Sequence, residues 1–215
     1  HSSKVAVLVS TLVMDGNTYV SGGTLDTAAG GTINVMATDS VVINGVVGQR
    51  DLGLAKVGLL HIESTAQDVS VYRNIDVRDH VELLGGSISV LSGSYVYATG
   101  EDSDVYVRAR TQLFVSGSTT VASTTLGDAL IKADKLVHLA APTMTVNGIV
   151  QAGIINSAGV HLGASNGRVL FNASQAITVD GGLISADGDI QLNAGVDMSW
   201  TRTRLEAAIS QDQLI

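Results

Sequence analysis

Aromatic and cationic side chains occupy alternate positions in two Val- and Ala-rich segments of this sequence, residues 95–98 and 105–110. In an extended strand, alternate side chains point to the same side, so the Val and Ala residues would point inward and the others outward. Tyrosine and arginine are enriched at recognition surfaces and can stack on sugars or meet a protein partner. If the two segments are adjacent, we expect one outward stripe; the alternative is an ordinary cross-strand ladder that stabilises the sheet. The candidate residues are Tyr72, Tyr95, Tyr97, Tyr106, Arg108 and Arg110.

Motifs for catalysis or nucleotide binding are weak. Residues 163–167 satisfy G-x-S-x-G, but a nucleophile elbow needs a histidine later in the chain, and the last histidine, His161, precedes Ser165. No two glycines are spaced i, i+2, and no Gly-Lys pair exists, so the dinucleotide and P-loop fingerprints are excluded. We also expect no pair of carboxylates beside Tyr106, which leaves polysaccharide hydrolysis without its acid and base. The sequence therefore predicts no enzyme and no cofactor.

Metal binding has little support in the spacing of the ligand-type residues. The chain has no cysteine, and its five histidines are never two or four positions apart. They are expected on coil walls or in turns, although a coiled fold can stack distant positions. Two acidic groups, residues 101–104 and 187–189, are interpreted as solvated turns, with weak calcium binding as the alternative. No metal site is predicted. The histidines are His1, His61, His80, His138 and His161.

The elements that must position these residues are strands. Hydrophobic residues make up 45% of the 215-residue chain, aromatic residues only 4%, and there are 24 glycines against one proline. Short alternating segments recur at drifting intervals and end at Gly, Asn or Asp, which tolerate positive φ. The small or β-branched apolar residues favour an all-β parallel β-helix, or β-solenoid, with a narrow core. The alternative is an antiparallel β-sandwich in which the Asn-Gly pairs form hairpins.

One stretch carries a resemblance to a known family. Residues 30–47, GGTINVMATDSVVINGVV, resemble a coil of the filamentous-haemagglutinin type of bacterial adhesin, and residues 167–194 are similar in character. The resemblance implies a single-stranded right-handed parallel β-helix that is exported to the bacterial surface. It also implies a role as an adhesin, a filament or a stalk.

The two ends of the sequence differ from its middle. We predict N-terminal capping strands in residues 1–24, β-helix coils in 25–200, and a C-terminal helical cap or connector in 201–215. Thr203 and Glu206 form a capping box before a run of helix-forming residues. Such a helix would cover the strand edges that a solenoid exposes at its end. Because the sequence begins at His1 without targeting features, we expect a fragment or a processed product.

The charge narrows the set of partners. The formal net charge of −8 disfavours nucleic acid, and no apolar run is long enough to insert into a membrane as a helix. We expect a structural, non-enzymatic segment of a bacterial surface adhesin or extracellular filament, located outside the cell or on its surface. Its expected partners are copies of itself, flanking coils of a longer chain, or a host or matrix glycan or protein. The alternative is a carbohydrate-binding or carbohydrate-cleaving β-helix, as in phage tailspikes and pectate lyases.

Overall fold

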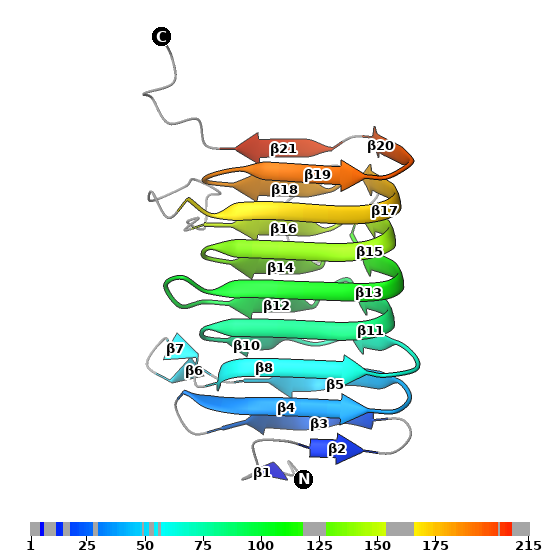
Figure 1. The fold of residues 1–215 in the computed structure, drawn as a ribbon. Coiled ribbons are helices and arrows are strands. Elements are labelled where there is room, and N and C mark those ends of the chain that lie inside the picture. The colour runs from blue at the N-terminus through cyan, green and yellow to red at the C-terminus, as the bar shows by residue number, and fades with distance from the viewer. Residues whose placement is uncertain are drawn as a thin grey trace.

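The chain forms an all-β, solenoid-like stack of coils (Figure 1). In the computed structural model we describe residues 5–6, 12–14, 18–27, 30–48, 50–51, 54–55, 57–117, 128–153, 166–201 and 203–207. Every regular element in these ranges is a strand, and nineteen strands join one continuous parallel sheet. The parallel pairing confirms the predicted solenoid-like architecture, and the antiparallel sandwich is wrong.

The pairing register divides the sheet into three faces that run along the stack. Face A contains β2 (Leu12–Met14), β4 (Gly31–Ala37), β8 (Val57–Ser64), the first halves of β11 (His80–Val90), β13 (Asp104–Val115), β15 (Leu136–Val146) and β17 (Arg168–Asp180), and β19 (Ile190–Ala194). Face B contains the first parts of β3 (Thr18–Asp26) and β5 (Val41–Val47), β9 (Val69–Val71), the second halves of the four long strands, and β20 (Asp197–Thr201).

Face C contains β1 (Val5–Ala6), the ends of β3 and β5, β10 (Ile75–Val77), β12 (Tyr95–Ala98), β14 (Leu130–Ala133), β16 (Ile149–Ala152), β18 (Leu183–Ala186) and β21 (Arg204–Ala207). A separate antiparallel pair, β6 (Arg50–Asp51) with β7 (Leu54–Ala55), lies outside the three faces. Each turn of the chain therefore visits faces A, B and C in order.

The core fills the inside of the coils with small and branched apolar residues. Along β12 and β13, Val and Ala side chains are buried while the residues between them reach the surface, as the alternation predicted. One inward column on face A runs through Ile62, Leu83, Val107, Leu139 and Phe171. Its members are at most 1% exposed. Successive members are 21, 24, 32 and 32 residues apart, which explains why the sequence repeat drifts.

Close coil contacts require glycine at particular corners. Gly48 has a φ of +78°, and a Cβ at this position would overlap the carbonyl oxygen of Asp76 in the next coil. Only glycine tolerates both the left-handed conformation and the approach of that backbone. The backbone conformation of the corner after β5 thus depends on Gly48.

The C-terminal helix predicted for residues 201–215 is wrong over the part that the structure describes. Arg204–Ala207 form β21, which pairs in parallel with β18, with Leu183 opposite Arg204 and Ala186 opposite Ala207. A helix begun at the capping box would pay the cost of nucleation for few hydrogen bonds, whereas β21 pairs with an existing strand edge. Residues 208–215 lie outside the described residues.

At the other end, β1, β2 and the start of β3 fall within residues 1–24 and pair in parallel with β3, β4 and β5. They therefore continue the stack of faces C, A and B. The domain boundaries at residues 24 and 200, and the right-handed winding, stay predictions.

Candidate functional site

The predicted stripe of tyrosines and arginines is divided between different sides of the solenoid. Tyr95 and Tyr97 lie on β12 in face C, which pairs with β10 and β14. Tyr106 and Arg108 lie on β13 in face A, which pairs with β11 and β15, and Arg110 is at the corner where face A bends into face B. The outward directions are confirmed, but a single stripe is wrong, because consecutive strands belong to different faces.

The remaining aromatic candidates are also apart from face A. The rings of Tyr95 and Tyr97 stack on each other with centroids 4.4 Å apart, and both side chains are half-buried. Tyr72 is 48% exposed in the segment between β9 and β10. These three tyrosines therefore form no common surface with Tyr106.

Face A instead gathers the histidines and carboxylates of four coils. One outward column places Asn34, His61, Glu82, Tyr106 and His138 in register, one per coil. Neighbouring coils are about 4.8 Å apart, so side chains that are 21 to 32 residues apart along the chain become near neighbours. The possibility that coils stack distant positions into one site is realised here.

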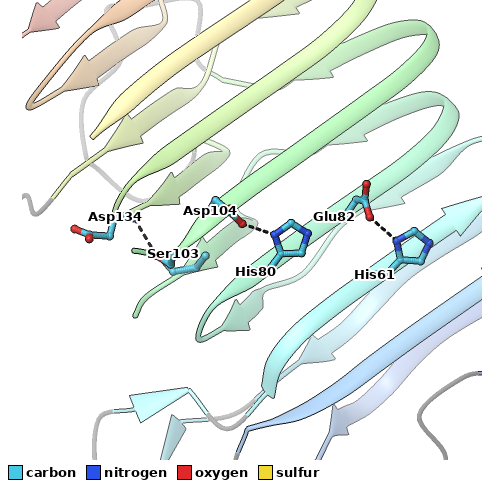
Figure 2. A network of polar contacts seen from close by, with 7 residues as sticks. His61, His80, Glu82, Ser103, Asp104 and Asp134 are labelled. Atoms are coloured by element: carbon cyan, nitrogen blue, oxygen red, sulfur yellow. Dashed lines mark hydrogen bonds and ion pairs between the residues drawn. The ribbon is translucent and has the colours of Figure 1, made fainter. Parts of the chain in front are cut away.

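His61 lies between two carboxylates, of which Figure 2 shows that of Glu82. Its Nδ1 is 2.8 Å from Glu82 Oε2 on the next coil, and its Nε2 is 3.5 Å from Glu63 Oε2 on the same strand. The imidazole thus links two coils, and forms ion pairs when it is protonated.

A second outward column begins beside it, with His80 hydrogen-bonded through Nδ1 to Asp104 Oδ1 (Figure 2). The His80 ring also faces the Tyr106 ring, with centroids 5.5 Å apart and a tilt of 44°. Burial, followed by the charges of Asp104 and Glu82, raises the pKa of Tyr106, so its hydroxyl stays protonated. The rings of Tyr106 and His138 form a T-shaped contact, again with a centroid distance of 5.5 Å.

His138 closes this aromatic row next to a pair of amides. Asn193 Nδ2 donates to Asn172 Oδ1 at 2.8 Å, which turns Asn172 Nδ2 toward His138 Nε2 at 2.9 Å. Because an amide nitrogen can only donate, Nε2 must accept, and the imidazole is neutral with its proton on Nδ1. Burial and then the positive charge of Arg108 lower the pKa of His138, in agreement with this neutral form.

A shallow groove of about 670 Å³ runs along the corner between faces A and B. It crosses four coils, and Arg108, Ala140, Asn172 and Asn193 stack in register along its face A side. The floor consists of alanines from the same coils: Ala109, Ala141, Ala173 and Ala194. Two of the predicted recognition residues, Arg108 and Arg110, line one end of this groove.

The acidic turns hold coils together. Ser103 is buried; its Oγ donates to the Ala98 carbonyl at 2.9 Å and accepts from the Asp134 backbone amide at 3.0 Å (Figure 2). Asp102 forms an ion pair with Lys135 of the next coil at 2.7 Å. In the other acidic group, buried Asp187 accepts a hydrogen bond from the Gly167 amide. Among the described residues, no group of three or more His, Asp or Glu side chains is placed to hold a metal ion.

Two features of face A were missed from the sequence: the carboxylates beside Tyr106, and the contact between His61 and Glu82. The expectation that carboxylates are missing beside Tyr106 is wrong, since Glu82 is its register neighbour and Asp104 shares its strand. A signal was present: the triplet His-apolar-Glu occurs at residues 61–63 and again at 80–82. The strands pair two residues away from the alignment that would place the two triplets side by side, so His61 lies opposite Glu82 and not opposite His80.

Several other sequence candidates cannot be placed. His1 and His161 lie outside the described residues, as does Ser165 of the G-x-S-x-G motif. Of that motif, only Gly167 and the preceding Asn166 are described; Asn166 has a φ of +51° at the entrance to β17.

Comparisons with known proteins assign no relative. A scan of family models, a search of curated proteins and a search of solved structures each gave no match. Within the described residues, no helix has the length and apolar character needed to cross a bilayer. The function therefore has to be argued from the coils themselves.

Proposed function

We propose that this chain is a structural, non-enzymatic segment of a bacterial surface adhesin or extracellular filament, wound as a right-handed single-stranded β-helix. The observation that carries the proposal is the unbroken stack of parallel strands around one apolar core. In the described part of the chain, face A holds eight strands, whose seven intervals of roughly 4.8 Å span about 34 Å.

Stiffness follows from the direction of the contacts. Strand hydrogen bonds run along the stack on three faces, so bending requires one face to lengthen while the others are compressed. The inward columns resist such a change because a packed core has little free volume. These properties suit a rod that projects a binding partner or polymerises.

The last described coil supports growth at the C-terminal end (Figure 1). Trp200 stands in register above Val179, and Leu205 above Ile184, both of which are fully buried. Trp200 and Leu205 are nevertheless 58% and 46% exposed. They occupy core positions that the described residues leave uncovered, and a further coil from a second copy would bury them at roughly 25 cal/mol per Å² of apolar area.

We assign no catalytic role to face A. A glycoside hydrolase uses two carboxyl groups that flank the scissile bond. Here Glu82 contacts His61, and Asp104 contacts His80. These contacts tie neighbouring coils together, which is the role that a rod requires.

End-to-end association tests the proposal. Electron microscopy and light scattering over a range of concentrations should show rods that lengthen with concentration, and Trp200→Lys with Leu205→Lys should return them to single units. Val196→Lys is the control, because Val196 is 82% exposed in the turn between β19 and β20. A wild-type chain that stays monodisperse at high concentration, or a double variant that assembles like the wild type, would refute the rod.

A further inference from the structure

The corner groove combines a positive end with an apolar floor. Arg108 and Arg110 are both exposed, and neither guanidinium forms an ion pair with any residue in the described part of the chain. Arg110 Nη2 donates to the Ser64 carbonyl of β8 at 2.9 Å, which holds its guanidinium on the β8 side of β13, at the outer margin of the groove's first coil. In a chain with a net charge of −8, this is a local reversal of charge that favours an anionic ligand.

The other end of the groove offers neutral hydrogen-bonding groups. Asn193 uses one amide hydrogen on Asn172. Its Oδ1 and its second hydrogen, together with the hydroxyl of exposed Ser174, have no partner among the described residues. Amides and hydroxyls both donate and accept, as sugar hydroxyls do. Along the groove, the partly exposed Ala140 and Ala194 can pack against the C–H faces of a sugar ring.

We propose that this groove binds an acidic polysaccharide, with its carboxylate or sulfate groups at Arg108 and Arg110 and its hydroxyls at Asn193 and Ser174. The four coils span about 14 Å at roughly 4.8 Å per coil, so a few linked sugars lie along the stack. An extended peptide fits less well, because it needs a free strand edge, and the backbone groups of β13, β15 and β17 are already paired between coils. This binding activity goes beyond the role as a rod.

Calorimetry with three probes tests the ligand class: polygalacturonate, the same polymer fully methyl-esterified, and heparin. Polygalacturonate or heparin should bind, with the stronger of the two identifying carboxylate or sulfate as the preferred group. The neutral ester should bind at least tenfold more weakly than polygalacturonate if carboxylates are recognised. Binding of neither acidic polymer, or equal binding of the ester and both acidic polymers, overturns the proposal.

Matched variants test the place. Arg108→Gln with Arg110→Gln should weaken binding at least tenfold, whereas Arg73→Gln with Arg168→Gln removes the same charge elsewhere and should change it less than twofold. Ala140 lies between the arginines and the amides, so Ala140→Glu should abolish binding and Ala140→Lys should retain or strengthen it. Equal losses in the two arginine pairs would mean that only net charge matters, and would refute a groove site.

An NMR titration of His138 gives a second readout that does not depend on affinity. The positive charge of Arg108 contributes to the low pKa of His138. An anionic group on Arg108 offsets that charge, so the pKa of His138 should rise when the probe is bound. An unchanged His138 titration at saturating probe would place the ligand elsewhere.

Discussion

Truncating two leucines of the same inward column should have unequal costs. Leu139 and Leu192 both lie on face A, one coil below and one coil above Phe171. Leu139 is fully buried between coils, whereas Leu192 lies in the last described coil and is only partly buried. Leu139→Ala should therefore lower the free energy of unfolding by about 2–5 kcal/mol, through lost burial and the cavity left behind.

Leu192→Ala should cost roughly half as much, about 1–2 kcal/mol, because part of its apolar surface already faces water. Urea unfolding followed by circular dichroism measures both values, with the slope of the transition checked for constancy. Leu59→Ala, an outward residue that is 37% exposed, is the control and should change stability by less than about 1 kcal/mol. Equal losses of unfolding free energy at Leu139 and Leu192 would refute the idea that the core at β19 is only partly covered.

Three further outcomes follow from the coil contacts. A double-mutant cycle of His61→Gln and Glu82→Gln should give a coupling free energy of only about 0.2–1 kcal/mol, and less at high salt, because the pair is partly exposed. Urea unfolding at two salt concentrations measures this coupling energy. A larger coupling energy that does not change with salt would contradict the prediction. Since the folded state lowers the pKa of His138 below its ordinary value of 6.5, the unfolded chain binds that proton first, so stability should fall as pH drops below that value. His138→Gln should flatten this decline in thermal unfolding, and an identical decline would point to another group. Gly48→Ala should lower the melting temperature more than Gly93→Ala, because Gly93 shares the positive φ but has open space around it. The difference between the two melting temperatures reports the backbone overlap at Gly48 alone. Equal decreases would contradict this prediction.

The faces of individual strands could be predicted from the sequence, because alternation depends only on neighbouring residues. Val96 and Ala98 point inward, and Tyr95 and Tyr97 outward, as the period of two requires. The helix over the capping box failed for a tertiary reason: the edge of β18 supplies a partner that local propensity does not register.

The relation between coils could not be predicted in the same way. Tyr97 and Tyr106 are nine residues apart but lie on different faces, while His61 and Glu82 are 21 residues apart and touch. Because coil length changes along the chain, the number of residues between two positions does not tell how many coils separate them. The candidate site depends on which residues of different coils lie side by side, and only the pairing register provides this information.

Variable coil length, with one inward column kept in register on face A, also makes the chain a natural scaffold for display. From Ile62 to Phe171 the coils take between 21 and 32 residues, yet every coil rises by one strand spacing. Residues inserted at a corner would therefore change the side chains at the surface without changing the spacing between coils. Foreign segments grafted at the corners of successive coils would stand about 4.8 Å apart along one line, at heights set by the scaffold alone.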